Sequence, residues 1–288
     1  MGQQSERGGY IPGVPCWVDV TVPDPAAVLP FYGGLFGWEF EDLAPEDAPA
    51  RYYIARLPGG DAAGVTTLPE ASPHGARWDT YVTVASVDET AAIARDAGGT
   101  VIAEPFDPGV GKMAVLADPE GALFVVWETR EGQGAEVVNE HGAVNFNTLA
   151  TRDPDAAAAF YGAVFGWRKL ELPSGVAWAM SSYGEHLEKA NPGLGEQMAQ
   201  MGAPDGFVDV VASLQPIADD DADASAYWSV VFGTDDTEAA VTKAVELGGR
   251  VVTEPFDAPW TRMAVLDDPQ GATFVISQFI PENKDLEG

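Results

Sequence analysis

The feature that most constrains this chain is that it contains much of its own sequence twice. Phe31–Trp38 returns as Phe160–Trp167, 129 residues later, and both segments read FYGxxFGW. Glu104–Asp107 returns as Glu254–Asp257, 150 residues later. A chain that repeats itself in this way is expected to fold as copies of one structural unit, so the repeat limits the fold before any other feature does.

The two offsets differ, which predicts an insertion of 21 residues in the second copy. The insertion must lie within about residues 185–226. We expect it to form one short helix around Gly195–Met201 and otherwise loop, including the acidic run Asp219–Asp221.

The length of 288 residues suits two domains at about 100–200 residues each. Gly132-Gln133-Gly134 marks a linker between the copies. We expect a first domain at 10–130, a linker at 131–142 and a second domain at 143–280.

Each copy divides further into two similar modules. Trp17–Val22 alternates as a strand does, and Asp24-Pro25 then supplies a helix cap followed by proline at the first helical position. Pro30 should bend that helix or limit its first turn. The second module repeats the order with a strand at Asp79–Val84 and a helix at Asp88–Ala97, which Gly98-Gly99 can end. Further strands are expected at Arg51–Leu57, Gly64–Leu68, Thr100–Ala103, Lys112–Leu116 and Leu123–Thr129. The predicted fold class is α+β, with the order βαβββ occurring four times.

Charge and hydropathy exclude several classes of function. The net charge of −30 repels phosphate backbones and anionic membranes, so no nucleic-acid or membrane partner is expected. No stretch reaches the roughly 18 apolar residues that span a bilayer, and Met1–Gly9 does not resemble a signal peptide. The single cysteine, Cys16, cannot form an internal disulfide and is expected to be a small buried residue. We therefore expect a cytoplasmic protein. Its expected partner is a small molecule, and its expected state is a monomer or homodimer.

The repeated motifs resemble those of the vicinal oxygen chelate superfamily, which includes glyoxalases, bleomycin-resistance proteins and extradiol dioxygenases. The resemblance covers about Gly13–Phe279 and is carried by Asp24 with Phe31–Trp38, Gly98-Gly99 and the turn Asp118–Gly121. It implies that the modules form two open, barrel-like curved mixed sheets with helices on the outside. It also implies a small-molecule pocket. The motifs are helix starts and turns, so they identify the fold and leave the chemistry open.

Metal-using members of that superfamily place histidine on the first strand of each module and glutamate on a late strand. The matching positions are, in order along the chain, Trp17, Asp79, Val125, Phe146, Ser229 and Val275. Only Asp79 could ligate a metal, and one carboxylate does not hold one. His74, His141 and His186 are expected in surface loops and are not spaced for a replacement site. No metal and no other cofactor is expected.

Strand alternation predicts which side chains share the pocket with those positions. The candidate ligand-binding residues are Trp17, Thr21, Tyr81, Val125, Trp127, Phe146, Thr148, Ser229, Val275 and Ser277. Asp19 and Asp79 join them as candidate catalytic residues, since two neighbouring buried carboxylates would raise one pKa and could act as acid or base. The aromatic residues could equally belong to the core, and each carboxylate could simply be hydrogen-bonded or solvated.

Three functions are compatible with this pattern. The first is metal-independent binding of a small aromatic or hydrophobic molecule, as in bleomycin-resistance proteins. The second is an enzyme of small-molecule metabolism (a lyase, isomerase, hydrolase or hydroxylase) that uses Asp19 and Asp79. The third is a metal-dependent glyoxalase or dioxygenase, which the substituted ligand positions disfavour. Binding ranks first because it requires only a pocket, and no nucleophile motif such as Gly-x-Ser-x-Gly occurs.

Overall fold

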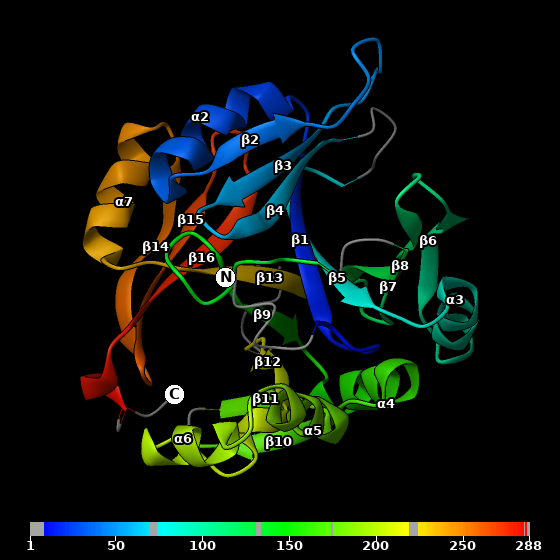
Figure 1. Cartoon of the computed structure of the whole chain (residues 1–288), viewed down its shortest axis with the longest axis vertical. Helices are drawn as coiled ribbons and strands as arrows, with labels where there is room; N and C mark the ends of the chain where they lie inside the picture. The colour runs from blue at the N-terminus through cyan, green and yellow to red at the C-terminus, as the bar shows by residue number, and fades with distance from the viewer. Residues whose placement is uncertain are drawn as a thin grey trace.

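Two mixed sheets of eight strands each form the centre of the molecule (Figure 1). The computed structural model describes residues 9–68, 74–130, 134–173, 175–218, 224–284 and 286. The first sheet has the strand order β2 (Glu39–Asp42), β3 (Tyr52–Leu57), β4 (Gly60–Thr67), β1 (Pro15–Val22), β5 (Arg77–Thr83), β8 (Leu123–Thr129), β7 (Gly111–Ala117) and β6 (Thr100–Phe106). Its helices are α2 (Pro25–Phe36) and α3 (Val87–Asp96).

The second sheet repeats this arrangement with the later half of the chain. Its order is β10 (Arg168–Leu172), β11 (Gly175–Ala179), β12 (Val210–Pro216), β9 (Val144–Thr151), β13 (Tyr227–Gly233), β16 (Thr273–Phe279), β15 (Thr261–Asp267) and β14 (Arg250–Ala258). The accompanying helices are α4 (Pro154–Phe165) and α7 (Thr237–Glu246), and a single 3-10 turn, η2 (Pro281–Asn283), follows β16. Both sheets are open, and the predicted α+β class with four βαβββ modules is confirmed.

The insertion contains more structure than the sequence predicts. The expected short helix is present as α6 (Leu194–Gln200), but it is preceded by α5 (Ser181–Ala190) and followed by η1 (Phe207–Asp209). The sequence predicts only loop in residues 185–226 apart from that short helix. This is wrong for the part of α5 in this range and for β12 (Val210–Pro216). Gly184 breaks the helical pattern of α5, and no side chain caps its start, so the usual helix signals are weak. Asp219–Asp221 lies outside the described residues.

The two repeated helix starts differ in how they are capped. Asp153 accepts hydrogen bonds from the backbone N–H groups of Asp155 and Ala156, as a capping aspartate should. The side chain of Asp24 makes no such bond. Instead its backbone N–H donates to Oε1 of Gln270, at 2.9 Å, from the other half of the chain. The helix α2 runs unbroken through Pro30.

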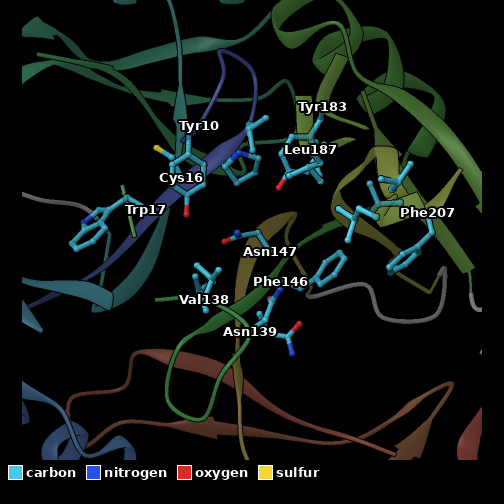
Figure 2. A pocket seen from close by; sticks show the side chains of 18 of the residues that line it. Tyr10, Cys16, Trp17, Val138, Asn139, Phe146, Asn147, Tyr183, Leu187 and Phe207 are labelled. Atoms are coloured by element: carbon cyan, nitrogen blue, oxygen red, sulfur yellow. The ribbon is translucent and has the colours of Figure 1, made fainter. Parts of the chain in front are cut away.

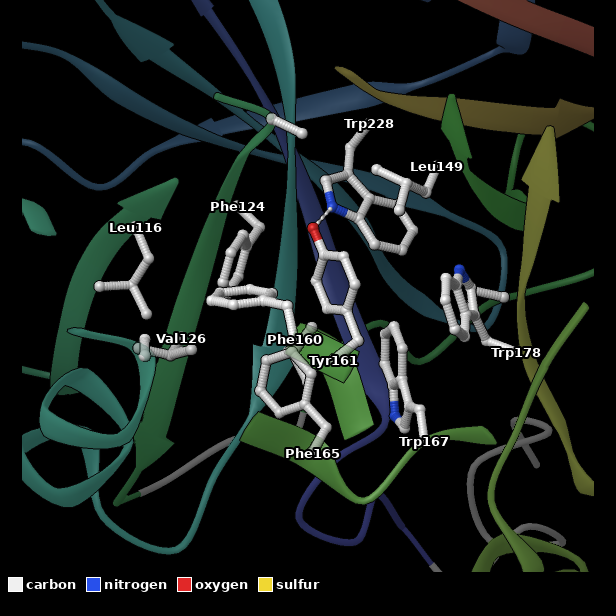
Figure 3. Close-up of a cluster of buried hydrophobic side chains, with 14 of the residues drawn as sticks. Leu116, Phe124, Val126, Leu149, Phe160, Tyr161, Phe165, Trp167, Trp178 and Trp228 are labelled. Atoms are coloured by element: carbon white, nitrogen blue, oxygen red, sulfur yellow. Dashed lines mark hydrogen bonds between the residues drawn. The ribbon is translucent and has the colours of Figure 1, made fainter. Parts of the chain in front are cut away.

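Each of the two main hydrophobic cores contains residues from both halves of the chain. One joins Val82 and Phe124 of the second module to Phe160 and Tyr161 of the third. Figure 3 shows the rings of Phe124, Phe160 and Tyr161, with the hydrogen bond from Trp228 Nε1 to the Tyr161 hydroxyl. The other joins the first module to the fourth and includes Val18, Val20, Phe36, Phe232 and Phe274. The helices pair accordingly, α2 with α7 and α3 with α4. None of the helices in the described ranges is both long and apolar enough to cross a membrane.

Candidate functional site

Two aspartates lie side by side on neighbouring strands of the first sheet. Asp19 of β1 and Asp79 of β5 are register partners in the antiparallel ladder, and both side chains are buried. They lie on the sheet face opposite the helices, because Val18 and Val20 on either side of Asp19 belong to the helix-facing core. The structure therefore brings the two candidate catalytic carboxylates together.

The two carboxylates have different partners. Asp79 accepts a hydrogen bond from Arg77 Nε at 2.8 Å and another from the Thr21 hydroxyl at 2.8 Å. Asp19 accepts one from the Tyr81 hydroxyl at 2.6 Å. Its other oxygen, Oδ1, is buried and has no hydrogen-bond partner among the described residues. The cationic partner thus belongs to Asp79.

This difference decides where a proton resides. Burial, and then the neighbouring Asp79 carboxylate, raise the pKa of Asp19 to about 7, against the opposing effects of Tyr81 and Arg77. Burial also raises the pKa of Asp79, and Arg77 and Thr21 oppose that shift. Because Arg77 stabilises a charge on Asp79, the first proton that the pair takes up is expected on Asp19. The pair can hold and release one proton near neutral pH.

Other predicted pocket residues of the first half lie on the same sheet face, on one side of this pair. Trp17 donates from Nε1 to the Tyr52 hydroxyl at 3.1 Å. Tyr81 and Val125 pack with Cys16 in a small cluster, and Trp17 and Trp127 lie half-buried against it. Burial raises the pKa of the Cys16 thiol to about 12, so the expected buried, unreactive cysteine is what the structure shows.

The corresponding face of the second sheet carries no charge at these positions. Thr148 and Ser229 are register partners in β9 and β13, where the first sheet has Asp19 and Asp79. Val275 and Ser277 of β16 follow on the same face, Val275 half-buried and Ser277 buried. The two halves share a fold but differ in chemistry, and only the first half has the paired carboxylates.

The residues present do not fit a metal of the kind used by glyoxalases and dioxygenases. Across the described ranges, no three or more His, Cys, Asp or Glu side chains form a group that could hold an ion. Two histidines bond to the chain itself: His186 Nε2 lies 2.9 Å from the Gly9 carbonyl oxygen, and His141 Nδ1 accepts from the Asp235 N–H. The expectation that His186 lies in a surface loop is wrong, since it is half-buried in α5.

A cavity of about 470 Å³ lies where the two halves meet. β1 pairs with β4 only from Asp19 onward, and β9 pairs with β12 only from Thr148 onward. The first residues of β1 are therefore not paired with β4, and the first residues of β9 are not paired with β12. The cavity lies at these unpaired strand starts. The helices α5 and α6, with η1, contribute the rest of the wall, so the insertion completes the cavity.

The cavity wall is mostly apolar and aromatic, with several amide side chains. Figure 2 shows Asn147 and Phe146 of β9 below Tyr183 and Leu187 of α5 and below Tyr10 and Cys16, with Phe207 to the right of Phe146. The remaining lining residues are Val14, Pro15, Trp17, Val18, Val138, Asn139, Val144, Asn145, Asn191, Leu194, Met198, Phe207, Val208, Val210 and Val211. Apolar walls with a few polar groups, at this volume, are typical of small-molecule sites.

A second cavity of about 490 Å³ lies at the starts of β5 and β13. Among the predicted site residues, Asp79 and Ser229 line it, with Arg77 and His74 beside them. Only Trp17 and Phe146 of the predicted residues line the first cavity. The other predicted residues line neither cavity.

The sequence-based search missed every residue that the insertion contributes to the first cavity. Tyr183, Leu187, Met198 and Phe207 lie between β11 and β12, where the first half has only the short turn between β3 and β4, so the repeat gives no position for them. The available signal was the insertion itself, since extra chain in one copy of a repeat often carries the binding surface.

Comparisons with known proteins agree with this architecture. A profile of the "Glyoxalase/Bleomycin resistance protein/Dioxygenase superfamily" matches residues 143–276, and one of the "Glyoxalase-like domain" matches residues 17–127. Similar structures include the Mn(II)-bound glyoxalase from Novosphingobium aromaticivorans, with a TM-score of 0.57, 16% identity and coverage of 92% of this chain and 82% of that one. The 2,3-dioxygenase LapB from Pseudomonas sp. KL28 gives a TM-score of 0.55 at 14% identity, covering 93% of each chain.

Two relatives match over nearly their whole length. The protein named "Putative glyoxylase CFP32" of Mycobacterium bovis is 33% identical over 283 residues, which cover 96% of this chain and 99% of that protein. The "Anthracycline biosynthesis protein DnrV" of Streptomyces peucetius is 34% identical over 282 residues, covering 93% of this chain and 94% of that protein. With its four βαβββ modules and these matches, the chain belongs to the glyoxalase/bleomycin resistance protein/dioxygenase superfamily, the vicinal oxygen chelate superfamily.

Proposed function

We propose that this protein binds a small, planar, largely apolar molecule in the cavity between its halves, without a metal ion. The observation that carries the proposal is the cavity of about 470 Å³ with Phe146, Tyr183 and Phe207 in its wall. Aromatic rings of this kind stack against flat ligands, and each such contact contributes about 0.5–1.5 kcal/mol beyond the buried area. Sequestration of the ligand, as in bleomycin-resistance proteins, requires nothing further.

Two further observations support this choice of ligand and mechanism. A relative 34% identical over nearly the whole chain is named for anthracycline biosynthesis, and anthracyclines contain fused planar rings. The superfamily's metal-ligand positions hold Trp17, Val125 and Phe146, whose side chains cannot ligate a metal. In this proposal the protein acts in the cytoplasm as a monomer or homodimer, with a small molecule as its partner.

Isothermal titration calorimetry with two planar probes, an anthracycline aglycone and 1-naphthol, tests the proposal. The protein is first treated with EDTA. We expect saturable binding of at least one probe, weakened about tenfold by Phe146→Ala, which corresponds to ~1.4 kcal/mol. Phe279→Ala is the matched control, because Phe279 is 65% exposed and lies outside the cavity wall. Absence of binding by both probes, or equal weakening by the two variants, would refute the proposal.

A second candidate function is proton transfer by the Asp19–Asp79 pair. The observation in its favour is that the pKa of Asp19 is about 7, which suits a general acid or base at neutral pH. Binding ranks first because the Asp19 side chain is only 1% exposed and does not line either cavity. Mass spectrometry of the bound probe after incubation separates the two functions. A binding protein leaves the probe's mass unchanged, whereas an enzyme converts it and loses that conversion in Asp19→Asn.

A further inference from the structure

One polar pair interrupts the apolar contact between the two halves next to the first cavity. Thr80 of β5 donates its hydroxyl proton to Oδ1 of Asn147 in β9, at 2.9 Å. Both residues are buried: Thr80 is completely buried, and 7% of the surface of Asn147 is exposed. This hydrogen bond joins the central strands of the two sheets across the boundary between the halves.

The internal repeat provides a direct comparison for this pair. The equivalent of Asn147 in the first half is Val18, and the equivalent of Thr80 in the second half is Val230. Both valines are buried in the other hydrophobic core. Since the fold accepts two valines at the same place, packing does not require the threonine–asparagine pair. Burying two polar groups without a structural need is a feature of functional positions.

The orientation of Asn147 determines what it offers to the cavity. Its side-chain carbonyl oxygen already accepts a hydrogen bond from Thr80, so its NH₂ group is the part that can bond to a ligand. Among the described residues, none accepts a hydrogen bond from that NH₂ group. Asn147 lines the cavity, and Figure 2 shows its amide near the centre of the group of side chains, between Cys16 and Phe146. The amide therefore presents hydrogen-bond donors to a ligand.

We propose that Asn147 is a specificity-determining residue whose NH₂ group, oriented by Thr80, donates to a carbonyl oxygen of the ligand. This inference rests on the proposed function and narrows its ligand to planar aromatic ketones and quinones. A carbonyl oxygen matches the site because it accepts a hydrogen bond without bringing a charge into an apolar cavity. A ligand with a methylene group in place of that carbonyl would leave the buried donors unpaired, which is how polar sites reject close analogues.

The test uses 9-fluorenone and fluorene, two planar molecules that differ only in having a carbonyl or a methylene at one ring position. We expect the natural protein to bind 9-fluorenone about tenfold more tightly than fluorene. Asn147→Asp replaces the donors by acceptors at almost unchanged shape and should abolish this preference. Thr80→Val releases the Asn147 carbonyl group and should reduce the preference without changing fluorene affinity.

Fluorene binding to each variant serves as the control for folding, together with the thermal midpoint. Equal affinity of the natural protein for the two probes would overturn the inference and leave the proposed function standing. A preference that survives in Asn147→Asp would also overturn it. If neither probe binds the natural protein while the anthracycline aglycone and 1-naphthol also fail, the proposed function falls and this inference falls with it.

Discussion

Tyr32 in α2 donates its hydroxyl proton to Asp268 at 3.0 Å, across 236 residues of sequence. Tyr161 in α4 makes the equivalent bond to Asp118 at 3.1 Å. Each tyrosine belongs to one copy of the FYGxxFGW motif, and each aspartate begins the turn before the last strand of the opposite half. The repeated motifs therefore do more than shape each copy, because they bond the two halves to one another.

The first prediction concerns this bond. Tyr161→Phe should lower the free energy of unfolding by about 1–3 kcal/mol, because Asp118 Oδ2 and Trp228 Nε1 both lose their hydrogen bonds to the Tyr161 hydroxyl. Urea denaturation measures the change. Tyr227→Phe is the matched control, since Tyr227 is 52% exposed and its loss of a hydroxyl should be nearly neutral. Equal effects of the two substitutions would contradict the role given to the buried tyrosine.

A second prediction follows from the raised pKa of Asp19, which is about 7 in the folded protein and about 3.9 in an unfolded chain. Between these values the folded state holds a proton that the unfolded state has lost. The free energy of unfolding therefore falls as pH rises through this window and is constant, for this group, above it. From pH 6 to pH 8 the decrease due to Asp19 should be about 1 kcal/mol.

Urea denaturation at pH 6 and pH 8 checks this second prediction. Asp19→Asn cannot titrate, so its stability should change less over the same range than that of the natural protein. The difference between the two proteins isolates Asp19 from all other titrating groups. Identical pH dependence in both would show that Asp19 has an ordinary pKa.

The third prediction concerns metal content. Purified protein should contain no stoichiometric Fe, Zn, Ni or Mn, because the superfamily's ligand positions hold side chains such as Trp17 and Val275 that are not donors. Elemental analysis measures the metal content of the protein. Binding of the planar probe before and after EDTA treatment shows whether binding requires a metal. About one tightly held metal per half, whose removal abolishes binding, would be the opposite result.

The sequence predicted much of the fold because the fold depends on local signals. Alternation defines β1 and β5, and Gly98 takes the left-handed conformation that ends α3, with φ of 93°. Sharing of the cores between halves could not be predicted, since nothing local to Tyr32 indicates that its partner is Asp268.

The candidate site was predicted less completely than the fold, for a similar reason. Strand parity placed Asp19 and Asp79 together, because register partners on one face follow from alternation. The cavity between the halves arises where β1 and β9 separate from their neighbours, and an insertion closes it. Strand separation depends on tertiary packing, so alternation alone could not indicate that Phe146 would line the same cavity as Tyr183.

A crystal structure of the protein with a bound planar probe tests the central claim most directly. We predict density for the anthracycline aglycone between β9 and α5, with its ring plane against Phe146 and no metal ion in contact with it. Density for the probe on the face of the first sheet beside Asp19, or a metal ion bridging protein and probe, would contradict the account.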